Sequence, residues 1–125
     1  MELIKTSSLF IALLVSLLSQ AAPAKATVID DLRALNDEAK ELASKIKQYY
    51  AARDNAQAAG ESKLACDFQA GITLRIADLM KVHNEKAEIF KSHGMSESRQ
   101  KELTAFTTLD KIGELEYAEF NQRCR

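Results

Sequence analysis

Residues 28–50 read VIDDLRALNDEAKELASKIKQYY, and their apolar side chains recur at alternating steps of four and three residues. The series comprises Val28, Leu32, Leu35, Ala39, Leu42, Ile46 and Tyr49, and Arg53 and Ala56 continue it. A seven-residue repeat sustained in this way is typical of a long helix that packs along another helix. The pattern predicts a helix over about 28–59, with Thr27 as its N-cap.

Two further segments show three- and four-residue apolar spacing, and glycines separate all three. The second segment covers about 62–92, after Gly60, and the third covers about 96–124, after Gly94, with Ser96 as its N-cap. The second apolar stripe comprises Phe68, Ile72, Ile76, Leu79, His83, Ala87 and Phe90. The third stripe is less regular and comprises Leu103, Phe106, Leu109, Ile112, Gly113, Tyr117 and Phe120.

The composition favours an all-α fold. The single proline is Pro23, so the chain after it contains no residue that breaks a helix outright. Short connections force consecutive helices to run antiparallel, which predicts an elongated up-down-up three-helix bundle formed by one domain, residues 27–125. The alternative is a helical hairpin that completes its hydrophobic core by dimerisation, because the seam of the first helix resembles a coiled coil.

The N-terminal segment has the three parts of a secretory signal peptide. Lys5 supplies a positive charge, residues 9–18 read LFIALLVSLL, and Ala24-Lys25-Ala26 has the small-x-small form of a signal peptidase site. We therefore expect residues 1–26 to be removed and Thr27 to become the N-terminus. An uncleaved anchor is the alternative, although the apolar stretch is shorter than the ~20 residues that span a bilayer. The expected location is the bacterial periplasm, with the extracellular space as the alternative.

The two cysteines are placed for a disulfide between the second and third helices. Cys66 lies 29 residues before Met95, at the centre of the predicted turn, and Cys124 lies 29 residues after it. In an antiparallel hairpin, residues equidistant from the turn lie side by side. Exported chains usually pair their cysteines, so we expect a Cys66–Cys124 bond that stabilises the fold. A redox-active or intermolecular role is the alternative.

Charge argues against two classes of partner. Removal of Glu2, Lys5 and Lys25 with the signal peptide leaves 15 basic and 17 acidic residues of the original 17 and 18. A net charge near −2 without a basic run does not favour binding to nucleic acid or to anionic lipid. No further segment is apolar and long enough to suggest stable membrane insertion after cleavage.

Few residues suggest a metal site, a haem site or a catalytic site. Met80 and His83 share a helix face and could bind a metal or haem iron, whereas the alternative is a hydrogen-bonded histidine beside a methionine that fills a gap. The acidic residues of the third helix, Asp110, Glu114, Glu116 and Glu119, are typical of a solvated face. The sequence contains no metalloprotease, hydrolase or phosphate-loop motif, so we expect neither catalysis nor a cofactor.

The remaining candidates are residues for contact with a partner. Tyr49 and Tyr50 are adjacent and cannot both face one core, and exposed Tyr beside Arg is common at interface hot spots. We therefore expect Tyr50 and Arg53 to form a weak candidate interface. The function that the sequence favours is binding of another protein of the cell envelope or exterior, as an inhibitor, chaperone-like factor or assembly factor, with homodimerisation left open.

Overall fold

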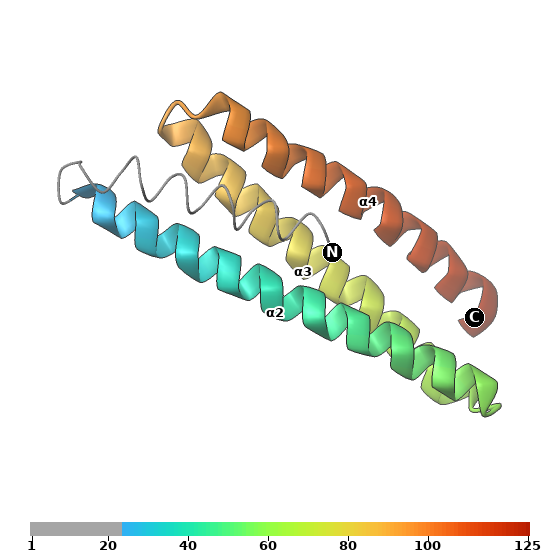
Figure 1. The fold of residues 1–125 in the computed structure, drawn as a ribbon. Helices are drawn as coiled ribbons and strands as arrows, with labels where there is room; N and C mark the ends of the chain where they lie inside the picture. Colours follow the sequence, from blue (N-terminus) through green and yellow to red (C-terminus); the bar gives the residue numbers. More distant parts are fainter. Residues whose placement is uncertain (1–23) are drawn as a thin grey trace.

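The computed structural model describes residues 24–125, with side chains from residue 27 onward. It consists of three helices, α2 (Ala24–Ala58), α3 (Ser62–Ser92) and α4 (Ser96–Cys124), which alternate in direction (Figure 1). No strand occurs in this part of the chain, and the predicted all-α three-helix bundle is confirmed. The predicted signal peptide, residues 1–26, lies almost wholly outside the described residues. No helix from residue 24 onward is apolar over enough length to cross a membrane.

The two predicted glycine breaks are confirmed, and both have the same hydrogen-bonding pattern. Gly60 and Gly94 have φ angles of 74° and 67°, in the left-handed region that suits glycine. After α2, the Glu61 N–H donates to the Ala56 carbonyl at 2.9 Å; after α3, the Met95 N–H donates to the Phe90 carbonyl at 2.9 Å. These six-residue closures are Schellman motifs, which end a helix and reverse the chain.

Both predicted N-caps are wrong. Thr27 lies inside α2, because the helix-favouring residues of 24–26 extend the helix upstream of it. Ser96 is the first residue of α4, and Met95 occupies the cap position without a side-chain hydrogen bond. Met95 packs instead against the cluster of Leu32 and Phe90, so an apolar contact fixes the start of α4.

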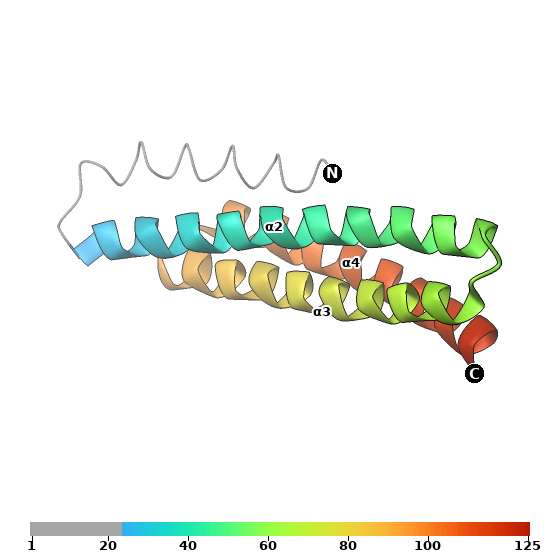
Figure 2. The ribbon, with the colours of Figure 1, turned by 90° about the horizontal axis from the view of Figure 1, so that it is seen from below.

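The central helix of the bundle is α3. It packs against both α2 and α4, whereas no Cα atom of α2 lies within 8 Å of a Cα atom of α4 in the described chain (Figures 1 and 2). The main hydrophobic cluster combines residues from all three helices: Ala39, Leu42, Ile46, Ile72, Ile76, Leu79, Val82 and Leu109. The contribution of α4 to this cluster is therefore the smallest.

The predicted apolar stripes of α2 and α3 coincide with the observed core, whereas the stripe of α4 coincides with it only in part. Leu109 is buried as predicted, but Ile112 and Tyr117 are 37% and 50% exposed, and the other buried residues of α4 are Ser98, Glu102 and Ala105. The helix is thus rotated so that a glutamate faces α3, while Leu103 and Phe106 are half-buried. The cause is a buried polar cluster, described below.

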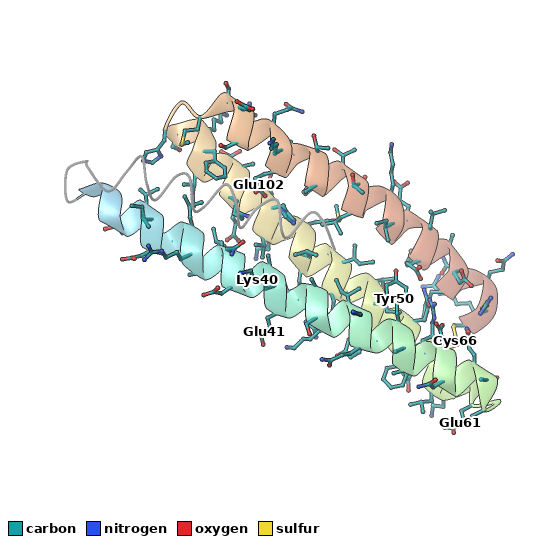
Figure 3. All side chains as sticks on the ribbon, in the orientation of Figure 1. Lys40, Glu41, Tyr50, Glu61, Cys66 and Glu102 are labelled. Atoms are coloured by element: carbon teal, nitrogen blue, oxygen red, sulfur yellow. A yellow bond between two sulfur atoms is a disulfide. The ribbon has the colours of Figure 1, made fainter. Side chains whose placement is uncertain are left out.

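The structure joins the two cysteines that the spacing predicts to be paired. Cys66, in the first turn and a half of α3, is bonded to Cys124, the last residue of α4, with their Cα atoms 5.7 Å apart (Figure 3). The bond fastens the end of the α3–α4 hairpin that lies opposite the Gly94 turn. Both ends of this hairpin are therefore closed covalently.

Loss of this bond should lower stability. The cysteines are 58 residues apart, and in the chain-entropy model a loop of that length is worth roughly 4 kcal/mol. We expect Cys66→Ser combined with Cys124→Ser to lower the melting temperature by more than about 10 °C. Circular dichroism melts of the oxidised protein, the reduced protein and the variant would measure this. Equal melting temperatures for all three would contradict it.

Candidate functional site

A cluster of three ionisable side chains lies buried between α3 and α4. Glu102 of α4 accepts a hydrogen bond from His83 Nδ1 at 2.6 Å on one carboxylate oxygen and forms an ion pair with Lys86 Nζ at 3.0 Å on the other. His83 and Lys86 are one turn apart on α3, so both reach the same carboxylate. All three side chains are at most 3% exposed, and Figure 3 places Glu102 between the two helices.

Burial and pairing act on these charges in opposite directions. Burial by itself would raise the pKa of Glu102, but the hydrogen bond from His83 and the charge of Lys86 outweigh it, and the pKa of this carboxyl is lowered. Burial lowers the pKa of Lys86, and the attraction of Glu102 offsets part of that effect. Glu102 is thus an ionised acceptor held by two donors, which explains why a glutamate can occupy the centre of the α3–α4 contact.

The metal or haem hypothesis gains no support from this geometry. His83 Nδ1 is already used by Glu102, and its Nε2 is buried without a hydrogen-bond partner among the described residues. The positive charge of Lys86 on the same carboxylate would repel a metal cation. Met80 lines a groove on the surface, and no group of three His, Cys, Asp or Glu side chains within residues 27–125 could hold a metal ion.

A second polar network joins all three helices near the disulfide. Arg53 of α2 donates to Gln69 of α3 at 2.8 Å and to Glu116 of α4 at 3.1 Å. The Gln69 amide donates to the Glu116 carboxylate at 2.6 Å, and the Tyr50 hydroxyl donates to the other carboxylate oxygen at 3.0 Å. The network supplies a direct connection between α2 and α4, whose backbones do not approach each other.

Tyr50 and Arg53 are therefore engaged within the chain. The Arg53 guanidinium also lies 4.9 Å from the centre of the Tyr50 ring, in a cation–π contact. Burial and the neighbouring Glu116 charge raise the pKa of Tyr50 to about 12, as expected for a phenol that donates to a carboxylate. Their predicted role in partner binding stays a prediction, but the contacts that the structure gives them are internal.

The surface offers grooves on both flanks of α3. The α3–α4 groove has a floor of Ile76, Met80 and Gly113, a rim of Asp110 and Glu114, and the half-exposed Tyr117 at its side; its volume is about 290 Å³. The lack of a side chain at Gly113 lets the helices approach, since a Cβ atom there would lie 3.3 Å from Ile76 Cγ2.

The α2–α3 groove lies on the other flank of α3 and measures about 460 Å³. Leu35 and Ile89 form its floor, and Asp31, Glu85 and Glu88 stand at its rim. Figure 2 shows α2 and α3 running side by side along this part of the molecule. Neither groove is predicted from the sequence, because apolar periodicity identifies the buried stripe of a helix and gives no signal for the exposed positions beside it.

The four acidic residues that the sequence marks on α4 are divided among three environments. Glu116 belongs to the buried network, and Glu119 forms an exposed pair with Arg123 at 2.8 Å. Asp110 and Glu114 stand at the rim of the α3–α4 groove.

Comparisons with known proteins identify no relative. No protein-family model, no curated protein and no solved structure matches this chain. The candidate site is therefore defined by the geometry alone, and its two possible locations are the grooves that flank α3.

Replacement of Glu102 should destabilise the fold in a pH-dependent way. Glu102→Gln removes the charge that compensates Lys86 and should cost about 3 kcal/mol at pH 7. Because folding lowers the pKa of Glu102 below its ordinary value of 4.5, its stabilisation is complete above that value and is lost as the pH falls through the lower folded pKa. The difference between wild type and variant should therefore shrink below about pH 4.

Urea unfolding at pH 7, 4 and 3 would measure this difference. Glu114→Gln is the matched control, because Glu114 is exposed on the same helix and should change stability by less than about 0.5 kcal/mol. A Glu102→Gln variant as stable as wild type at pH 7 would show that the buried cluster does not hold α4.

Proposed function

We propose that the protein is exported and acts by binding another protein with the outer face of α3, without catalysing a reaction. The observation that carries the proposal is the pair of grooves with apolar floors on the two flanks of this helix. Leu74, 62% exposed, lies on the outer side of α3, next in sequence to Thr73 of the α3–α4 groove. Exposed apolar grooves on a small domain are typical of surfaces that receive a helix or an extended segment of a partner.

The use of the polar side chains supports a role in binding. His83 and Lys86 occupy both oxygens of the Glu102 carboxylate in the interior, and Arg53, Gln69 and Tyr50 do the same for Glu116 near the disulfide. Neither set lines the two grooves with apolar floors, and only Gln69 reaches a cavity, of about 210 Å³, beside the disulfide. The groups that a catalyst would need at an open surface are instead committed to holding the helices in register.

Export is supported by two features that differ in kind. The signal-like segment of residues 1–26 is a sequence feature. The Cys66–Cys124 bond is a structural feature, and disulfides of this kind persist in oxidising compartments such as the periplasm. The proposed location is the periplasm, where a partner would be an envelope protein.

Export should produce a protein that begins at Thr27. We expect intact-mass measurement of the periplasmic fraction to give the mass of residues 27–125 less two hydrogens, with no free thiol. Ala26→Arg places a large charged residue at the cleavage site and should leave the full chain in the membrane fraction. Full-length wild-type protein in the cytoplasm with reduced cysteines would refute export.

A photo-reactive cross-linker placed on the outer face of α3 should form a covalent bond with the partner. We expect a photo-reactive amino acid at position 74 to give a discrete adduct in living cells, identifiable by mass spectrometry. Position 115 is the control, because Leu115 is similarly exposed, at 71%, but lies on α4. Adducts at 115 alone, or at neither position, would show that the outer face of α3 is not the binding surface.

A further inference from the structure

The distribution of charge around the α2–α3 groove is one-sided. Its lining includes the carboxylates Asp31, Glu85 and Glu88, and no cation. All three side chains are exposed, whereas Leu35 and Ile89 beneath them are half-buried and pack against the core. The groove thus combines an apolar floor with a rim of three negative charges.

A charged cavity of about 360 Å³ continues the groove along the same two helices, and Glu85 borders both. Its lining carries three cations and four carboxylates, a net charge of −1. Lys45 pairs with Glu41 at 3.7 Å and Arg75 pairs with Asp78 at 2.8 Å, and the remaining charged residues of the lining are Lys81, Glu38 and Glu85. Figure 3 shows Glu41 on the edge of α2 that points away from α4, which is the edge of this cavity. The two cavities together follow α2 from Asp31 to Lys45, or roughly 21 Å at 1.5 Å per residue.

We propose that the α2–α3 groove binds a cationic amphipathic helix of a partner protein, an inference that rests on the proposed function and assigns it a site and a partner class. A helix of about 14 residues matches the length of the two cavities. Its apolar stripe lies on Leu35 and Ile89, and its Lys or Arg residues face Asp31, Glu85 and Glu88. Helix-in-groove binding uses apolar anchors for affinity, and complementary charges set the orientation and the encounter rate.

Residues 27–125 of a second copy do not supply this helix. The exposed large apolar side chains of the described residues are Leu64, Leu74, Ile112, Leu115 and Tyr117. None of them has more than one Lys or Arg within four residues on either side in the sequence. The complementary segment, with cations on both sides of an apolar stripe, must therefore come from another protein.

The test uses the protein purified from the compartment where it accumulates and three synthetic 16-residue peptides. The first carries leucines at helical spacing flanked by lysines, the second has glutamates in place of the lysines, and the third has the lysines without an apolar stripe. Fluorescence anisotropy should show saturable binding of the first peptide alone. No saturation by about 1 mM, or equal binding of the second or third peptide, would overturn the proposal.

Matched variants locate the binding site. Glu85→Gln with Glu88→Gln should weaken binding about tenfold, since each lost charge pair at a surface is worth a few-fold. Asp110→Asn with Glu114→Gln removes the same charge from the α3–α4 groove and should change affinity less than twofold. Equal weakening by both pairs would show that net charge, rather than this groove, attracts the peptide.

Cellular cross-linking separates this inference from the proposed function. A second probe at position 84, where the exposed Asn84 lines the α2–α3 groove, should give an adduct that disappears in the Glu85→Gln, Glu88→Gln background and persists in the Asp110→Asn, Glu114→Gln background. The reverse pattern, or an adduct at position 74 without one at 84, would overturn the α2–α3 site and leave partner binding intact, whereas absence of both adducts in wild type would overturn both. A dimer in sedimentation that dissociates on neutralisation of Glu85 and Glu88 would assign the groove to a second copy.

Discussion

The bundle depends on a single helix that must be buried on two sides. Since α2 and α4 each pack on α3 and their backbones stay apart, α3 has to present apolar side chains to both neighbours. Ile72, Ile76 and Leu79 meet this requirement, and each is at most 2% exposed. The remaining strip of α3 points outward. A central helix of this kind leaves exposed positions on both of its flanks. The two grooves with apolar floors lie there.

Polar contacts fix the position of α2 and α4 relative to each other. The backbones of α2 and α4 do not approach each other, so side chains that reach across have to set the relative register of the two helices. The Arg53–Glu116 ion pair, supported by Gln69 and Tyr50, connects them at one end. Glu102 fixes the rotation of α4 on α3 near the other end, because only one rotation brings its carboxylate to both His83 and Lys86. Buried networks of this type specify an arrangement more than they stabilise it.

Features that depend on residues close together in the sequence could be predicted, whereas features that depend on residues far apart in the sequence could not. Helix ends and turns depend on neighbours within six residues, so Gly60 and Gly94 are enough to predict them. The Cys66–Cys124 pairing then follows from the position of the second turn. The rotation of α4 depends on contacts of Glu102 with two hydrogen-bonding side chains, Lys86 and His83, which lie 16 and 19 residues earlier in the chain, and no periodic pattern reveals such contacts. For the same reason Arg53 and Tyr50 resemble interface residues in the sequence, while their partner Glu116 lies more than 60 residues away.

The net charge of the chain also does not predict how charge is distributed on the folded surface, and this distribution matters for partner binding. A formal net charge of −1 does not favour nucleic acid or anionic lipid, but it does not distinguish among protein partners. The fold, however, buries or pairs several of the cations: Lys86 and Arg53 face carboxylates within the bundle, and Lys45 and Arg75 are paired at its surface. Carboxylates without such partners then remain along one groove, at Asp31, Glu85 and Glu88. A local field of one sign over an apolar floor can select a partner even when the whole chain is close to neutral, because screening limits electrostatic attraction to about 10 Å.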